Sequence, residues 1–363
     1  MKHISIFFFL FIFSFFVSAT IPFGYYTTLN GKQTAALKTE LHKILMKDTT
    51  RYLSYGSGFN RTWQGFYATD RNTANNLVVD MYSNTLRYYS TDYVGLNYPG
   101  FGQELHIEHS LPKSWWGSYE WAAYKDLHHL YPADGSMNLS KSNNPLGVVT
   151  GTPTKDNGLS KSGPGAYNGY VGNVFEPADQ YKGDFARSYF YMATAYEHYV
   201  NLWNITAPEN MMEKNTYPVF KTWAKELLLQ WHRQDTVSEK ERSRMEKVYS
   251  IQGNRNPFID YPELVEYIWG NSTDFPWNVS TANQPLENPL LTIKRNVTGF
   301  TVESDETIPI GVAIYAIDGK QILSCKSSTN TEINLPKTAS GIVFFEISSS
   351  NFVIRQKQMI TTH

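Results

Sequence analysis

Residues 106–138 read HIEHSLPKSWWGSYEWAAYKDLHHLYPADGSMN, and the rest of the chain is interpreted around this stretch. Glu108 and Asn138 offer hard oxygen ligands of the kind that Mg²⁺ accepts. Two such ligands suffice because Mg²⁺ keeps several waters and is often completed by substrate phosphate. His109 titrates near neutral pH and is suited to take a proton from water. This set of residues therefore favours metal-assisted hydrolysis of a phosphodiester.

The placement of these residues on secondary structure sets a geometric condition. Neighbouring residues of a regular strand point to opposite faces, so Glu108 and His109 serve one centre only where their strand ends or bends. The proline three residues after His109 makes such an end credible. Asn138 is expected on a short helix, with Asp134 or Ser136 as its cap.

Four motifs in order over residues 105–260 resemble the secreted endonuclease I family of ββα-metal, or His-Me finger, nucleases. The motifs are Glu-His-x-x-Pro-Lys-Ser-Trp from Glu108, Asp-Leu-His-x-Leu-x-Pro-Ala-Asp from Asp126 followed by Asn138, Phe-Glu-Pro at 175–177 leading to Arg-Ser-Tyr-Phe-Tyr-Met at 187–192, and Gln-Gly-Asn-Arg-Asn-Pro-Phe at 252–258. The resemblance covers residues 25–270. It implies an α+β fold, in which a ββα-metal core is surrounded by helices and long loops.

The resemblance also implies roles for individual residues. His109 matches the general base that activates water, Glu108 matches the first metal ligand, and Asn138 matches the second. The implied metal is Mg²⁺, with Mn²⁺ or Ca²⁺ as alternatives. The implied reaction is hydrolysis of DNA, and often of RNA, with little sequence preference and with 5′-phosphate ends.

The cation that holds the cleaved phosphate is the open point of the site. Some members of the family use an Arg between the first two motifs, and this chain has none there. The candidates are therefore Lys113, Lys125, Arg187 and Arg255. Supporting roles are expected for His128, Asn143 and Asn256.

Simpler interpretations stand beside these assignments. The pair His128-His129 suggests zinc, but the ligand spacing of a zinc site is missing. Trp115 and Trp116 are expected in packing rather than in stacking on bases, because the whole chain is rich in aromatic residues. For residues 254–256, contact with phosphate and bracing of a loop are equally good interpretations.

The N-terminus has the pattern of an export signal. Lys2 precedes an apolar run from Ile4 to Val17, and small residues follow at 18–19. A run this short favours a cleaved signal peptide at 1–19 over a membrane anchor, which needs about 20 apolar residues. The mature protein is therefore expected outside the cytoplasm, with no transmembrane segment after signal cleavage.

Composition limits the class of protein. The chain has 363 residues, 41% of them hydrophobic, which is enough for real cores. Lys and Arg number 32 against 33 Asp and Glu, so bulk positive charge cannot drive the chain onto nucleic acid. Apolar spacing predicts helices at 34–47, 186–203, 219–232 and 264–269, the first capped by Thr34. The Gly-, Pro- and Asn-rich stretch 132–183 predicts long loops with short pieces of structure.

A composition shift near residue 277 marks a second domain. The expected domains are a nuclease domain at 20–275, a linker at 276–290 and a small all-β sandwich at 291–363. Strands are predicted at 311–317, 332–335, 341–347 and 352–354, with an Asp-Gly turn at 318–319. Residues 312–320, 340–347 and 355–357 resemble the sorting domain of proteins exported by the type IX system, which implies secretion machinery as a partner. A generic domain that binds surfaces or sugars is the alternative.

These patterns together predict a secreted, metal-dependent, non-specific endonuclease. The rival interpretation is a cell-surface protein that binds nucleic acid or glycan through an inactive finger. Glu108, His109 and Asn138 all retain the required chemical types, and this favours the enzyme.

Overall fold

The computed structural model describes residues 21–22, 24–47, 49–89, 105–117, 121–203, 209–278, 292–296, 299–304, 307–316, 320–336, 341–348 and 353–360. The predicted signal peptide, the Asp-Gly turn and most of the predicted linker lie outside these residues. The chain divides into two compact units. The first holds Gly31–Trp277, and the second holds Asn278–His363 together with Ile21–Asn30. In the part of the chain that is described, no helix combines the length and apolarity that a membrane crossing requires.

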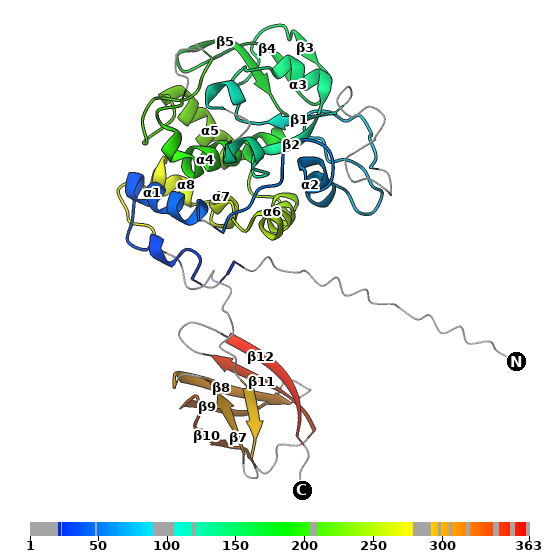
Figure 1. The fold of residues 1–363 in the computed structure, drawn as a ribbon. Helices are drawn as coiled ribbons and strands as arrows, with labels where there is room; N and C mark the ends of the chain where they lie inside the picture. The colour runs from blue at the N-terminus through cyan, green and yellow to red at the C-terminus, as the bar shows by residue number, and fades with distance from the viewer. Residues whose placement is uncertain are drawn as a thin grey trace, which may run out of the picture. The chain divides into compact units, whose positions relative to one another are not determined.

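The first unit is built around one buried helix, α4 (Asp179–Ala195). All of its residues from Lys182 to Ala195 are buried. Figure 1 shows α5 (Thr222–Gln234) alongside α4, and these two helices pack against each other. The other helices of this unit are α1 (Thr34–Leu45), α2 (Thr62–Thr69), α3 (Gly135–Lys141), α6 (Glu239–Gln252), α7 (Pro257–Asp260) and α8 (Leu264–Ile268), with 3₁₀ turns η2 (Lys113–Trp115), η3 (Ala122–Lys125) and η4 (Glu197–Tyr199).

The predicted helices exist, with shifted ends. The predicted helix 186–203 begins seven residues earlier as α4 and finishes as the separate turn η4. Thr34 does not cap α1. Instead it is the first residue of α1, with φ of +50°, and no side chain caps this helix.

The candidate residues lie on two strands and the helix that follows them. Strand β1 (Leu105–His109) pairs antiparallel with β2 (Leu130–Asp134), and α3 follows β2 directly. The register is regular and places Glu108 opposite Tyr131. Asp134 caps α3 as expected, because its side chain accepts a hydrogen bond from the amide of Met137 at 2.8 Å.

The stretch 132–183 holds more regular structure than its composition indicates. Three short strands, β3 (Lys155–Asp156), β4 (Lys161–Tyr167) and β5 (Tyr170–Glu176), form an antiparallel sheet. The two-residue turn Asn168-Gly169 between β4 and β5 has positive φ at both positions, which Asn and Gly adopt readily. The short pieces of structure expected in this stretch therefore include a three-stranded sheet.

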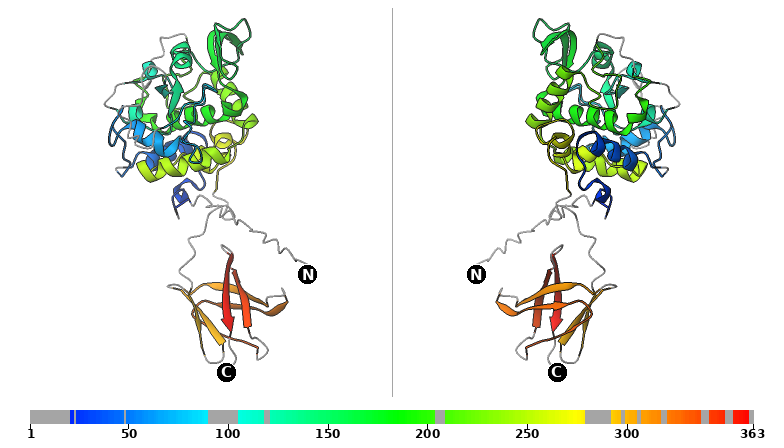
Figure 2. Two further views of the ribbon diagram at one scale, coloured as in Figure 1. Left: turned by 90° about the vertical axis from the view of Figure 1, so that its right-hand side faces the viewer. Right: turned by 90° about the vertical axis from the view of Figure 1, so that its left-hand side faces the viewer.

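The second unit is a β structure of two sheets (Figure 2). One sheet has the order β10-β7-β6 and the other β12-β11-β8-β9. Side chains from both sheets share one apolar cluster, in which Phe300 and Phe345 meet edge to face at 4.8 Å. The strands are β6 (Thr292–Arg295), β7 (Gly299–Glu303), β8 (Pro309–Ala316), β9 (Gln321–Ser328), β10 (Glu332–Asn334), β11 (Gly341–Ser348) and β12 (Val353–Ile360). The α+β class and the C-terminal β-sheet region are thus confirmed.

Candidate active site

Glu108 is a buried carboxylate with two strong partners. The residue is 4% exposed. Its Oε1 accepts a hydrogen bond from the Tyr82 hydroxyl at 2.8 Å and lies 2.7 Å from the Lys141 ammonium. Since both contacts fall on Oε1, Oε2 is the oxygen that the described chain leaves for a cation.

Asn138 lies on the same side of α3 as Lys141. The two residues are three apart, and residues at that spacing are neighbours on a helix surface. Lys141 reaches Glu108, and Asn138 lies one turn earlier on α3. Its half-buried side chain lines an open hollow together with Tyr55 and His106.

The donor set tests whether a divalent metal fits here. A carboxylate oxygen of Glu108 and the amide oxygen of Asn138 are hard ligands. The hollow that Asn138 lines has room for the waters that Mg²⁺ retains, although Glu108 is buried and does not line it. Among the described residues, no three His, Cys, Asp or Glu side chains gather into a metal cluster. The residues therefore fit a weakly caged, water-rich ion rather than a closed zinc site.

His109 is half-buried and has a defined tautomer. Its Nε2 lies 3.1 Å from the carbonyl oxygen of Tyr124. A carbonyl only accepts, so Nε2 carries the proton and Nδ1 is the basic nitrogen of the neutral ring. Burial lowers the pKa of His109 well below its usual value, and the neighbouring His129, Lys113 and Lys141 act in the same direction. The ring is therefore a neutral base at pH 7.

Glu108 and His109 are adjacent in a regular strand, so they make separate contacts. Both groups nevertheless act on Tyr55, His109 by contact and Glu108 through its charge. The His109 ring stacks on the Tyr55 ring at 5.5 Å and 18°. Burial raises the pKa of Tyr55, and Tyr124 and the Glu108 carboxylate add to this rise. His109 is the last residue of β1, so the strand ends where the sequence predicted an end or a bend.

The two lysine candidates differ in their relation to the base. Lys113 is exposed on η2, with its Nζ 5.3 Å from the centre of the Tyr124 ring, and its charge acts on His109. Lys125 is half-buried at the end of η3. Of these two lysine candidates, Lys113 is the one whose charge acts on His109.

The two arginine candidates are held in buried ion pairs with other residues. Arg187 is fully buried, and its guanidinium makes two hydrogen bonds of 2.6 Å to the carboxylate of Glu241. Arg255 is also fully buried and binds the carboxylates of Glu246 and Asp260. Neither guanidinium faces solvent, so neither is exposed to a substrate phosphate.

Asp126 joins the separate motifs of the sequence. The residue is completely buried, and its Oδ2 accepts hydrogen bonds from the hydroxyls of Tyr191 and Tyr196 at 2.7 and 2.8 Å. Its Oδ1 accepts from the Gln252 amide and from the backbone of His128, both at 2.9 Å. The downstream motifs thus brace the loop that leads into β2.

Most of the supporting candidates are buried residues that help to hold these motifs together. His128 is buried, and its Nε2 lies 3.1 Å from the carbonyl of Asn254. Asn256 is buried and caps α7 by accepting from the amide of Phe258 at 3.0 Å. Residues 254–256 therefore brace a loop. Asn143 is exposed just after α3.

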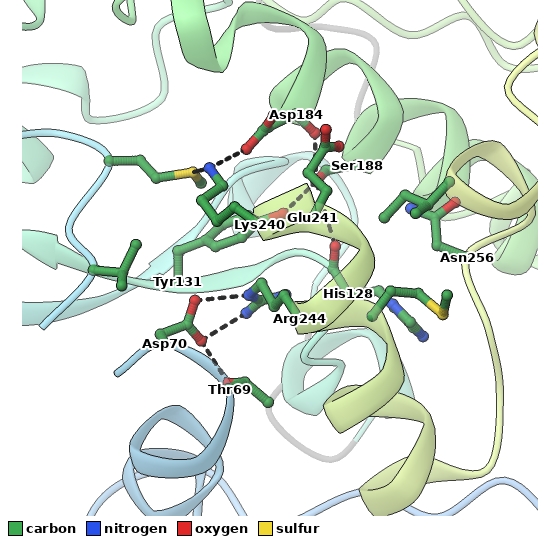
Figure 3. Close-up of a pocket in the computed structure, with 14 residues that line it drawn as sticks. Thr69, Asp70, His128, Tyr131, Asp184, Ser188, Lys240, Glu241, Arg244 and Asn256 are labelled. Carbon is green, nitrogen blue, oxygen red and sulfur yellow. Dashed lines mark hydrogen bonds and ion pairs between the residues drawn. The ribbon is translucent and has the colours of Figure 1, made fainter. Parts of the chain in front are cut away.

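A second cavity, drawn in Figure 3, holds none of the residues Glu108, His109 and Asn138. Its walls carry paired charges. Arg244 makes two hydrogen bonds to Asp70, at 2.7 and 3.0 Å, and the Lys240 ammonium contacts Asp184. Arg244 also donates to the carbonyl of Leu130 at 2.7 Å. These pairs tie α6 to the start of β2, so the cavity belongs to the scaffold.

Sequence reasoning missed Tyr82 and Lys141, the two partners of Glu108. Tyr82 precedes the motif by 26 residues, and nothing in its neighbourhood marks it. Lys141 did carry a signal, because it lies four residues after the buried Met137 on α3 and so shares its inner face. Trp115 and Trp116 are buried as expected.

Comparison with known proteins gives one family and two close relatives. Residues 33–263 match the family described as Endonuclease I. The chain is 34% identical over 249 residues to an extracellular ribonuclease of Bacillus amyloliquefaciens, a match that covers 68% of this chain and 78% of the relative. It is also 34% identical over 258 residues to an extracellular ribonuclease of Bacillus subtilis (strain 168), with the same coverage.

Proposed function

This chain belongs to the endonuclease I family and is a nuclease, a phosphodiester hydrolase, and we propose that it works as a secreted, divalent-metal-dependent, non-specific endonuclease. The observation that supports the proposal is that β1 carries Glu108 and His109 at its end, while Lys141, one turn after Asn138 on α3, contacts Glu108. His109 has a free basic Nδ1, and Glu108 and Asn138 offer oxygens on the side that α3 covers. We propose that β1, β2 and α3 form the ββα-metal core that the family resemblance implies.

In this mechanism His109 is the general base. Nδ1 takes a proton from the attacking water, whose oxygen forms the new bond to phosphorus. The bond between phosphorus and the 3′ oxygen breaks, which leaves a 5′-phosphate and, after protonation, a 3′-hydroxyl. The hydrogen bond from Nε2 to the Tyr124 carbonyl fixes the ring and stabilises the imidazolium that forms.

Glu108 and Asn138 would hold the metal, and we propose Mg²⁺ because both ligands are hard oxygens and Asn138 borders an open hollow. When bound, the ion supplies charge stabilisation to the phosphoryl and leaving oxygens. Lys113 is the proposed phosphate-holding cation, since it is exposed and acts on His109. Lys125 is a second, weaker candidate.

The substrate is proposed to be RNA as well as DNA. The two relatives are named ribonucleases, which supports RNA. The described lining of the hollow beside Asn138 contains no carboxylate, so it does not repel a phosphodiester backbone. A polyanion would therefore approach the site locally, although the whole chain has a net charge of −1.

The proposed location is outside the cell or at its surface. Relatives named extracellular support export, and the pattern at 1–19 is that of a cleaved signal peptide. We propose a nuclease domain at 20–275, a linker at 276–290 and a β domain at 291–363. For the β domain we propose a sorting role, with secretion machinery as its partner.

The test is cleavage of plasmid DNA and of ribosomal RNA by the mature chain in Mg²⁺, with and without excess EDTA. Cleavage of either polymer that EDTA abolishes, with 5′-phosphate ends, is the expected result. A folded protein that binds nucleic acid but cleaves neither polymer in Mg²⁺, Mn²⁺ or Ca²⁺ would support the binding-protein interpretation instead.

A further inference from the structure

The contact between Lys141 and Glu108 is a buried ion pair inside the proposed metal site. The side chains are 1% and 5% exposed, and Nζ lies 2.7 Å from Oε1. An ammonium this deeply buried requires a compensating negative charge. Glu108 is the carboxylate that the described structure provides for it.

The same short helix presents two groups to Glu108. Asn138 and Lys141 are one turn apart on α3, and Lys141 is its last residue, where the helix dipole favours a cation. A divalent ion held by Glu108 and Asn138 would therefore share the single negative charge of Glu108 with Lys141. The ammonium and the ion would repel each other across the shared carboxylate.

We propose that Lys141 is an internal counter-cation, which balances Glu108 in the metal-free protein and competes with the divalent metal for it. Lys141 is thus a positioning residue that sets metal affinity through Glu108. The inference rests on the proposed function, since it takes Glu108 as a metal ligand. Its consequence is a site that stays charge-balanced before the metal arrives and that binds the metal more weakly than its ligands alone would.

The experiment measures Mn²⁺ binding to the mature chain by electron paramagnetic resonance of the free ion, without substrate. Replacing Lys141 by Met removes the charge and keeps the length of the side chain. We expect K141M to bind Mn²⁺ at least about tenfold more tightly than the wild type. The rise in melting temperature on adding Mn²⁺ should also be larger, because tighter binding to the native state stabilises it more.

A matched control is available in the same unit. Lys38 is completely buried and lies 2.6 Å from the carboxylate of Glu197, on α1 and η4. The variant K38M therefore removes a similar buried pair that shares no residue with the proposed metal site. It should lower stability and leave Mn²⁺ affinity within about twofold of the wild type.

Two further variants keep the test decisive if K141M folds poorly. K141Q loses the charge but retains a donor for Oε1, and it should also tighten Mn²⁺ binding. K141R retains the charge and can bind both carboxylate oxygens, so it should not tighten Mn²⁺ binding. Y82F removes the other partner of Oε1 without changing charge, so it should not tighten binding.

The outcomes separate this inference from the proposed function. If E108Q abolishes Mn²⁺ binding while folded K141M and K141Q bind no more tightly than the wild type, the counter-cation role is wrong and the metal site stands. If E108Q leaves Mn²⁺ binding unchanged, the metal assignment itself fails, and the inference fails with it.

Discussion

Asp126→Asn should strongly destabilise the nuclease unit while leaving its shape almost unchanged. The carboxylate accepts four hydrogen bonds in complete burial, two at each oxygen. An Asn amide has only one acceptor, so two of the four donors would face an amide nitrogen. Each hydrogen bond to a buried charged group contributes about 1.5–3 kcal/mol, so losing two should cost about 3–6 kcal/mol. That is a large fraction of the 5–15 kcal/mol typical of a domain.

The assay is urea unfolding at pH 7 followed by tryptophan fluorescence. All nine tryptophans lie before residue 278, so the signal reports on the first unit alone. The control is D156N, because Asp156 is exposed. Only its Oδ1 accepts a hydrogen bond in the described structure, from the Gly158 amide, and the amide oxygen of Asn can accept the same bond. D156N should stay within about 0.5 kcal/mol of the wild type.

The pH dependence of this difference is a further check. Burial alone would raise the pKa of Asp126, but the nearby His128 and the hydrogen bond from Gln252 bring it below its usual value. A lowered pKa in the folded state means that the stabilisation is complete above the unfolded-state pKa of about 3.9 and is lost as pH falls through the folded-state value. A difference below about 1 kcal/mol at pH 7 would refute the view that Asp126 holds the motifs together.

Three further outcomes are expected. H109A should lower the cleavage rate by about 10²–10⁴-fold while Mn²⁺ binding and melting temperature stay close to wild type; near-normal cleavage would remove His109 as the base. K113M should lower kcat/KM by roughly tenfold, with less than about twofold loss for K125M, and equal losses would contradict the preference for Lys113. Burial lowers the pKa of His232 to about 4, and the nearby Arg187 adds to the effect, so the unfolded chain takes up this proton first and stability falls as pH drops below about 6.5. The stability gap between wild type and H232Q should therefore shrink by about 2.5 kcal/mol from pH 7 to 4.5 in urea titrations, and a constant gap would show that the fold does not lower the pKa of this ring.

Elements with an apolar pattern could be predicted from the sequence, and elements held by polar or backbone contacts could not. The helices α1 and α5 carry apolar residues at helical spacing, so their existence was visible. Helix α6 is very polar, and the apolar pattern gave no sign of it. The readable signal was Ser238 with Glu241 three residues later, which the structure shows as a complete capping box.

Strand β4 was missed because its sequence, with two glycines and a proline, indicates a loop. In the structure the glycines permit close packing. A Cβ at Gly165 would lie 2.6 Å from the carbonyl oxygen of Val148, so this strand can lie beside that segment only without a side chain there. Composition alone does not separate a glycine that breaks a strand from one that allows close approach.

The same limit explains why the motif residues were visible and the partners of Glu108 were not. Glu108, His109 and Asn138 could be identified from the sequence because their chemical types fit one reaction and they lie close together in the chain. Lysine is almost never fully buried, so Lys141 reads as a solvated residue at a helix end. Its position four residues after Met137 nevertheless places it on the buried face of α3, where a cation is tolerable only opposite an anion. A lysine on the inner face of that helix therefore already requires a buried carboxylate across from it, and Glu108 on the adjacent strand meets that requirement.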